Sequence, residues 1–152
     1  MAERDIIFLV GKEEYGLDVR VVTAIEPMMD IVPIPNAPKC ILGLMNLRGE
    51  VIPVYSLRKR FELDEYTDAS KNKLIVACYD GKFIAFKVDE VMEMQDFEDV
   101  DISDTPVIAK SARTTYVRAV ANKQGKLVLL LNPAGMYEGD EEAQIEEALK
   151  NI

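Results

Sequence analysis

Short apolar runs joined by tight turns recur along this chain, and they constrain its fold more than any other feature. The run Lys73–Tyr79 is followed by Asp80-Gly81 and then by a second apolar run, Phe83–Val88. Asp-Gly between two apolar runs is a strong signal for a β-hairpin, because both residues tolerate the positive φ angles that a two-residue hairpin turn requires. The pattern predicts a mainly β protein built from hairpins.

Two further hairpins follow from the same pattern. The first joins Ile6–Val10 to Tyr15–Asp18 through a polar turn. The second joins Gly43–Leu47 to Val51–Tyr55 through Arg48-Gly49-Glu50, where glycine is available for a positive φ. Residues 31–35 contain two prolines, so we expect only an edge strand or an irregular extended segment there.

Three short helices are predicted. One covers Val19–Ile25 and ends at Pro27, and a second covers Leu57–Phe61 with Ser56 as its N-cap. The third begins near Asp140 and places Ile145, Leu149 and Ile152 on one face. We expect this amphipathic helix to dock on the β structure of its own chain, with partner binding as the alternative.

The sequence repeats itself in part. Residues 15–22 resemble residues 84–91 at an offset of 69, and Asn46–Gly49 resembles Asn122–Gly125 at an offset of 76. The expected N-caps Ser56 and Asn132 then coincide. The repeat predicts two interleaved β-barrel subdomains within a single domain over residues 1–152, with a repeat boundary near 62–72. Each half is expected to form a five-stranded, barrel-like unit and to share apolar surface with the other.

Charge and composition exclude several functional classes. The net charge of −9 disfavours nucleic acid and anionic membrane surfaces, which are bound mainly through clustered Lys and Arg. The chain has no histidine, no Cys-x-x-Cys and no glycine-rich phosphate loop, so we expect no catalytic site, metal or cofactor. Cys40 and Cys78 are expected to be buried, reduced thiols. With no apolar stretch of about 20 residues and no signal-peptide core, we expect a cytoplasmic protein.

The run Gly43–Leu57 (GLMNLRGEVIPVYSL) resembles the central signature of the CheW family, Gly-x-x-Asn-Leu-Arg-Gly-x-x-x-Pro-x-x-x-Leu. Glu14–Val19 is similar to the family's second strand and first helix entry, and Phe83–Val91 is similar to its Val-Asp-x-Val region. One position departs from the family pattern, because Ala24 stands where the family often has glutamate. If residues 19–25 are helical, Glu26 points to a different side from Ala24 and is a poor substitute.

The resemblance implies a fold and a function. CheW-like domains consist of two five-stranded, SH3-like barrels packed side by side. Family members are adaptors without catalytic activity that couple the cytoplasmic tips of chemoreceptors to the regulatory domain of the histidine kinase CheA. The resemblance therefore implies chemotaxis signal transduction and attachment to membrane-anchored receptor arrays through partners. Two alternatives stay open: a CheW-like domain of another two-component system, and a small-molecule-binding β-barrel.

The resemblance also suggests where the partners bind. The receptor-binding residues implied are Val19, Val22, Ile25 and Arg48. Of the three apolar residues, we expect Val19 and Ile25 to pack on the barrel and Val22 to be exposed. The kinase-binding residues implied lie in the second subdomain; they are Ile102, Pro106 and Ile108.

Overall fold

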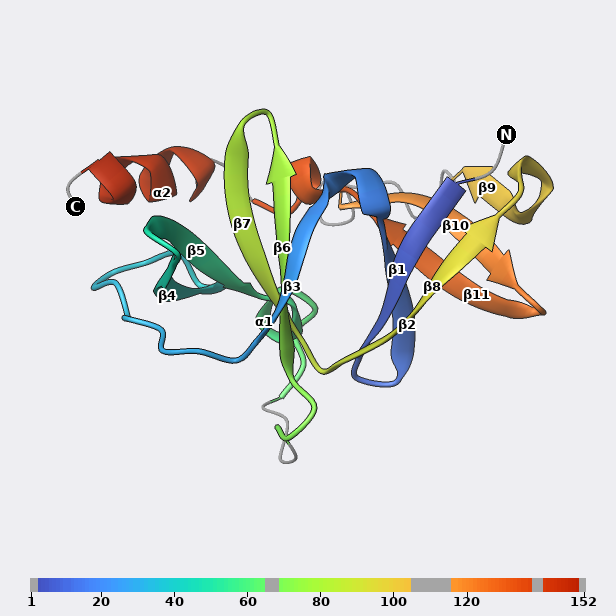
Figure 1. Cartoon of the computed structure of the whole chain (residues 1–152), viewed down its shortest axis with the longest axis horizontal. Helices are drawn as coiled ribbons and strands as arrows, with labels where there is room; N and C mark the ends of the chain where they lie inside the picture. The colour runs from blue at the N-terminus through green and yellow to red at the C-terminus, as the bar shows by residue number, and fades with distance from the viewer. Residues whose placement is uncertain (1–2, 65–68, 105–115, 138–140, 151–152) are drawn as a thin grey trace.

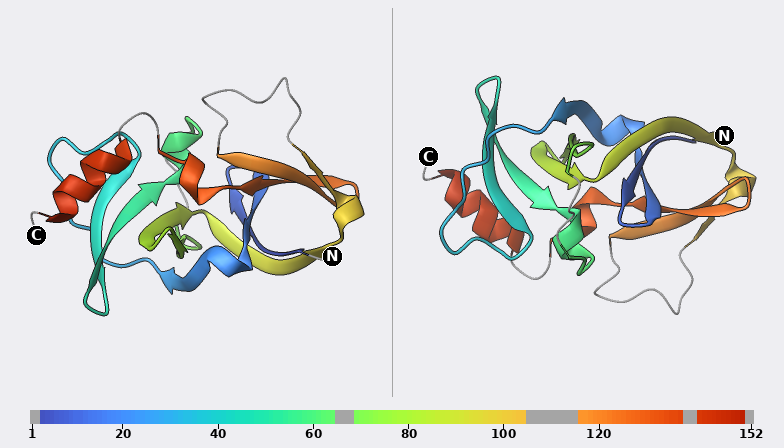
Figure 2. Two further views of the ribbon diagram at one scale, coloured as in Figure 1. Left: turned by 90° about the horizontal axis from the view of Figure 1, so that it is seen from above. Right: turned by 90° about the horizontal axis from the view of Figure 1, so that it is seen from below.

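The structure, a computed structural model, describes residues 3–64, 69–104, 116–137 and 141–150. Its strands form two sheets that lie side by side (Figure 1). Sheet A has six strands in the order β8-β1-β2-β11-β10-β9, and sheet B has five in the order β3-β6-β7-β5-β4. Seen from above or below, the strands of sheet A form a ring (Figure 2). The predicted mainly β fold with two subdomains is confirmed.

The strand bounds follow the apolar runs of the sequence. Those of sheet A are β1 (Glu3–Val10), β2 (Glu13–Asp18), β8 (Glu90–Phe97), β9 (Ile102–Asp104), β10 (Val117–Lys123) and β11 (Lys126–Leu131). Those of sheet B are β3 (Val22–Pro27), β4 (Ile41–Leu47), β5 (Glu50–Ser56), β6 (Lys73–Tyr79) and β7 (Lys82–Val88).

The two halves of the chain exchange hairpins. In the repeat, the strands β1, β2, β3, β4 and β5 correspond in turn to β6, β7, β8, β10 and β11. When each strand of sheet B is exchanged for its counterpart, its strand order becomes that of sheet A without β9. The β1–β2 hairpin therefore completes the sheet of the second half, and β6–β7 completes that of the first half. Each sheet thus takes strands from both halves of the chain, and neither half forms a five-stranded unit by itself. The repeat predicts the order of the elements, but the same apolar alternation fits either pairing.

The repeated turns have the same geometry in both halves. Arg48 and Gly49 have φ angles of 51° and 90°, and Gln124 and Gly125 have φ angles of 52° and 89°. In each turn the preceding asparagine side chain accepts a hydrogen bond from the glycine N–H, at 2.9 Å in the first half and 2.7 Å in the second. Two residues with positive φ form the turn that matches the twist of a hairpin. The structure thus supports the repeat at atomic level.

The helix predicted over Val19–Ile25 is wrong for most of its length. Only Val19–Val21 is helical, as the 3-10 turn η1, and Val22–Pro27 is the strand β3, paired with β6. The segment is rich in the β-branched residues Val, Thr and Ile, which favour strands because they are stiff at χ1. A strand directs its side chains differently from a helix, so the faces expected for a helix over this segment do not apply.

The other predicted helices are found. α1 (Leu57–Arg60) begins after Ser56, whose Oγ accepts a hydrogen bond from the Lys59 N–H at 3.2 Å. α2 (Glu141–Lys150) buries Ile145 in the main core and packs on its own chain, as expected. The predicted cap Asp140 and the terminal Ile152 lie outside the described residues. Two further 3-10 turns are η2 (Asp99–Asp101) and η5 (Pro133–Gly135).

The largest apolar core joins the two sheets. It contains Phe8 and Leu17 from sheet A together with Tyr55, Ile75 and Phe86 from sheet B. A smaller cluster fills each sheet separately. The expected sharing of apolar surface is confirmed, and the shared core fixes the two sheets in one orientation.

Neither cysteine is in a disulfide: Cys40 is buried and Cys78 is half-buried. In the described part of the chain, neither helix has the length and apolar character needed to span a bilayer.

Candidate protein-binding surfaces

Strand β3 carries the predicted receptor-binding residues Val22 and Ile25. A β-bulge separates Val22 from Ala24, and Val22 and Ile25 pair with Ala77 and Ile75 of β6, so both lie on the face of sheet B that looks toward the shared core. Val22 packs against that core, whereas Ile25 is 43% exposed. The expectation that Val22 is exposed and Ile25 is packed is therefore reversed.

Exposed apolar side chains continue beyond Ile25 along the chain. Met28 and Val32 follow it, and Val32 forms an isolated bridge with Leu44 of the edge strand β4. Val32 is held against the backbone of Gly43, where a Cβ atom would lie 2.2 Å from the Val32 oxygen. The residues Ile25, Met28 and Val32 thus give sheet B an apolar rim along its β3 edge and the segment that leads to β4.

Arg48 closes sheet B at this rim. Its guanidinium lies 3.1 Å from the carboxylate of Glu26, so the tip of the β4–β5 hairpin is tied to β3 at the opposite edge of the sheet. Because β3 is a strand, Glu26 lies on the same face as Ala24, whereas a helix would have pointed it to a different side. Arg48 itself is 75% exposed, so we expect this pair to contribute less than about 1 kcal/mol.

A corresponding ion pair closes sheet A. Lys123, near the tip of the β10–β11 hairpin, lies 2.5 Å from Glu93 of β8. Glu93 follows Ala24 by the repeat offset of 69, and it pairs with β1 as Ala24 pairs with β6. Sequence reasoning missed Lys123 and Glu93, although the repeat offset already placed a glutamate at the position equivalent to Ala24.

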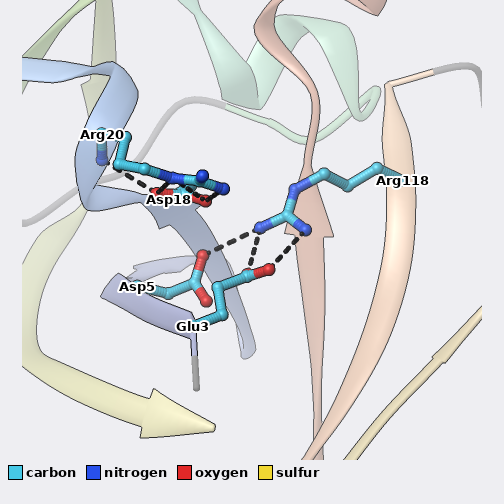
Figure 3. Close-up of polar contacts among 5 residues, drawn as sticks. All are labelled: Glu3, Asp5, Asp18, Arg20 and Arg118. Atoms are coloured by element: carbon cyan, nitrogen blue, oxygen red, sulfur yellow. Dashed lines mark hydrogen bonds and ion pairs between the residues drawn. The ribbon is translucent and has the colours of Figure 1, made fainter. Parts of the chain in front are cut away.

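A cluster of charged side chains links four elements at the other end of sheet A (Figure 3). Arg118 of β10 reaches β1, where it pairs with both oxygens of Glu3 and lies 3.0 Å from Asp5. Asp18, at the end of β2, is the register partner of Asp5 and binds the guanidinium and the N–H of Arg20 in η1. We call these five residues the Arg118 cluster.

Asp5 is the most unusual member of the Arg118 cluster. It is fully buried, and its Oδ2 atom has no hydrogen-bond partner among the described residues. Burial and the neighbouring carboxylate of Glu3 raise the pKa of Asp5 to about 8, against the opposing effect of Arg118. The hydrogen bond from Arg118 holds the pKa of Glu3 below its usual value despite partial burial. Asp5 is therefore a neutral acid at pH 7, beside an ionised Glu3.

This protonation state predicts a pH dependence of stability. Between about pH 4 and pH 8 the unfolded chain has released the Asp5 proton while the folded chain retains it. The folded state then binds more protons, so the free energy of unfolding falls as pH rises, by at most about 1.4 kcal/mol per pH unit. Asp5→Asn, which resembles the neutral acid, should remove this fall. Urea unfolding at several pH values measures it.

Asp96→Asn is the matched control for Asp5→Asn. Asp96 is an exposed carboxylate paired with Arg4, and that pair lowers its pKa. It is ionised in both the folded and unfolded states above about pH 5, so its replacement leaves the slope between pH 5 and pH 8 unchanged. Identical slopes for wild type and Asp5→Asn would contradict a buried neutral Asp5. With no histidine in the chain, few other groups titrate near pH 7.

The structure brings one predicted residue of each binding site together. Val19 and Arg20 of η1 and Ile102 of β9 line one open pocket of about 390 Å³ beside Glu3 and Asp18. The predicted receptor-binding and kinase-binding residues thus meet at this pocket in sheet A. The other predicted kinase-binding residues, Pro106 and Ile108, lie outside the described residues.

A buried ion pair braces the junction between the two sheets. Arg58 of α1 and Asp89, which follows β7, are joined by hydrogen bonds of 2.8 to 3.1 Å, and Asp89 also accepts the N–H of Gly11 at 2.8 Å. Gly11 lies in the β1–β2 turn of sheet A, whereas α1 follows β5 of sheet B. Asp89 therefore connects a turn of one sheet to a helix of the other.

The described residues hold no grouping of three or more His, Cys, Asp or Glu side chains suited to a metal ion. The ionisable groups singled out above are engaged in ion pairs between elements. The arrangement presents exposed apolar side chains beside ion pairs that link neighbouring elements.

Comparison with known proteins agrees with this description. Residues 6–141 match the family described as CheW-like domain. The chain is 28% identical to the chemotaxis protein CheW of Rhizobium meliloti (strain 1021), covering 90% of this chain and 88% of that protein. It is 27% identical to the chemotaxis protein CheW of Bacillus subtilis (strain 168), covering 86% and 83%. The crystal structure of the scaffolding protein TtCheW from Thermoanaerobacter tengcongensis superposes with a TM-score of 0.85 at 27% identity, covering 93% of this chain and 96% of that one.

Proposed function

This chain belongs to the CheW-like domain family, and from that premise we propose that it is a non-catalytic adaptor that couples chemoreceptors to the histidine kinase CheA. One partner is the cytoplasmic tip of a receptor and the other is the regulatory domain of the kinase. The protein acts in the cytoplasm, attached to receptor arrays through these partners.

The apolar rim of sheet B is the observation that carries the receptor half of the proposal. Ile25, Met28 and Val32 are exposed although the two sheets have well-filled cores. Exposed apolar patches mark interaction sites, and these three side chains follow one another along the segment that leads from β3 to the edge of β4. The Glu26–Arg48 pair beside Ile25 adds a polar margin, which is how protein interfaces are commonly built.

For the kinase half, support comes from sheet A. Ile102 is half-exposed at the edge strand β9 and pairs with Ala121 of β10. An edge strand offers unpaired backbone groups as well as side chains to a partner. The apolar rim proposed for the receptor lies on sheet B and Ile102 lies on sheet A, while Val19 of η1 adjoins Ile102 at the pocket described above.

The packing inside both sheets disfavours the alternative of a small-molecule-binding barrel. The interior of sheet A is filled by Ile7, Phe97, Val128, Leu130 and two alanines. That of sheet B is filled by Met45, Ile52, Val54, Leu74, Val76 and Ala85. A barrel that binds a ligand inside needs an unfilled interior.

The proposed function is tested by binding measurements with the purified chain. Calorimetric titration against the kinase regulatory domain and against a receptor tip fragment should give 1:1 complexes with each, and the three components should co-elute in gel filtration. Individual affinities are expected to be modest, because arrays strengthen binding through multivalency. A chain that binds neither fragment would overturn the proposal, and so would turnover of a nucleotide by the purified protein.

A further inference from the structure

The Arg118 cluster joins strands that are not neighbours. In sheet A, β2 and β11 lie between β1 and β10, yet Arg118 of β10 pairs with Glu3 and Asp5 of β1. Asp18 continues the connection from β2 into η1 through Arg20. Charged contacts therefore run from β10 to β1 and from β2 to η1, and the backbone pairing of Asp5 with Asp18 joins the two parts.

The two ends of this series are the elements that carry the proposed binding residues. Its η1 end holds Val19, next to Arg20. At the other end, β10 is paired with β9, which begins at Ile102. Both ends line the same open pocket, together with Glu3 and Asp18 of the cluster itself.

Burial makes the cluster respond as a unit. Asp5 is fully buried, and the side chains of Glu3 and Arg118 are only 19% and 29% exposed. If Arg118 moves away, it leaves one ionised and one neutral carboxyl group without their main partner in a poorly solvated site, where an unpaired polar group is costly. A shift of β10 is therefore transmitted to β1 and β2 rather than absorbed by water.

From this geometry we propose that the Arg118 cluster couples the receptor-facing turn η1 to the kinase-facing strands β9 and β10, with Arg118 as the positioning residue. The inference rests on the proposed function, because it assumes that the two partners bind at these two places. Occupation of one face biases the position of the cluster, and the cluster changes the affinity of the other face. Such coupling is reciprocal: each partner changes the affinity of the other by the same factor.

The coupling factor is measured by titrating the kinase regulatory domain into the chain, with and without a saturating receptor tip fragment. For the wild type, the receptor fragment should change the Kd of the kinase fragment by about fivefold or more. Arg118→Gln should bring this factor to within about twofold of one, while each fragment alone still binds with nearly its wild-type Kd. A role limited to stability would not alter the ratio in this way.

Arg4→Gln is the matched control. Arg4 lines the same pocket, but it is exposed and pairs with Asp96 outside the Arg118 cluster, so its replacement should leave the factor unchanged. If Arg118→Gln does not fold, Glu3→Gln breaks the same contact while Asp5 still holds Arg118. A coupling factor of one in the wild type would overturn the coupling proposal, and so would an unchanged coupling factor in Arg118→Gln. Either result would leave the proposed function standing. Failure of both fragments to bind overturns the proposed function as well.

Discussion

Asp89→Asn is expected to lower the free energy of unfolding by about 3 kcal/mol, because it removes the charge that compensates the largely buried guanidinium of Arg58. Asparagine has nearly the same shape and can still accept the N–H of Gly11, so the loss reports the ion pair rather than a cavity. Chemical unfolding at pH 7 measures it.

Two further variants identify the cause of this loss. Asp96→Asn breaks an exposed pair with Arg4 and should cost less than about 1 kcal/mol. The double variant Arg58→Gln with Asp89→Asn should recover part of the loss, since neither side chain of the pair is then charged. If Asp89→Asn costs no more than Asp96→Asn, the brace does not stabilise the junction.

The same substitution has a consequence for binding. Asp89 ties the β1–β2 turn of sheet A to α1 after sheet B, so it helps to fix how the two sheets are oriented. The apolar rim proposed for the receptor lies on sheet B, and Ile102 of the proposed kinase face lies on sheet A. Loosening the junction should therefore weaken the ternary complex more than either binary complex.

The sequence was sufficient to predict most of the local elements. Asp80-Gly81 and Arg48-Gly49 are found as hairpin turns with positive φ, and Ser56 caps its helix. These signals are local: the residue types themselves satisfy the turn or cap, whatever lies elsewhere in the fold. The amphipathic pattern of α2 was informative for the same reason, since Ile145 and Leu149 share one face at helical spacing.

What could not be predicted depends on contacts between distant residues. Which hairpins pass from one sheet to the other is decided by the parallel pairs β2–β11 and β5–β7, and no local pattern specifies such a pair. The Arg118 cluster joins residues more than 100 positions apart. The short segment 19–25 has apolar residues three apart, a spacing that fits a helix as well as an irregular strand, so its pattern alone does not separate the two. The single domain over 1–152 and the roles of the binding residues stay predictions.

Ile25→Lys is expected to weaken binding of the receptor tip fragment by more than about tenfold while the protein remains folded. Ile25 is the apolar side chain that β3 presents to solvent beside the Glu26–Arg48 pair, and a buried apolar anchor at an interface commonly contributes more than about 1 kcal/mol. Lysine is well tolerated on edge strands, so the substitution removes the apolar contact and adds a charge without disturbing the sheet. Titration calorimetry and thermal unfolding measure the two effects separately.

Val22→Asp should behave in the opposite way, because Val22 points inward and packs on the shared core. A carboxylate there faces apolar neighbours, so we expect a loss of about 2 kcal/mol or more in unfolding free energy. Leu127→Lys, at an exposed apolar position of β11, makes the same chemical change as Ile25→Lys on a different surface and should leave receptor binding within about twofold. Equal losses of receptor binding in Ile25→Lys and Leu127→Lys would show that charge alone weakens the complex. A stable, binding-deficient Val22→Asp would instead place the receptor contact at Val22 rather than at Ile25.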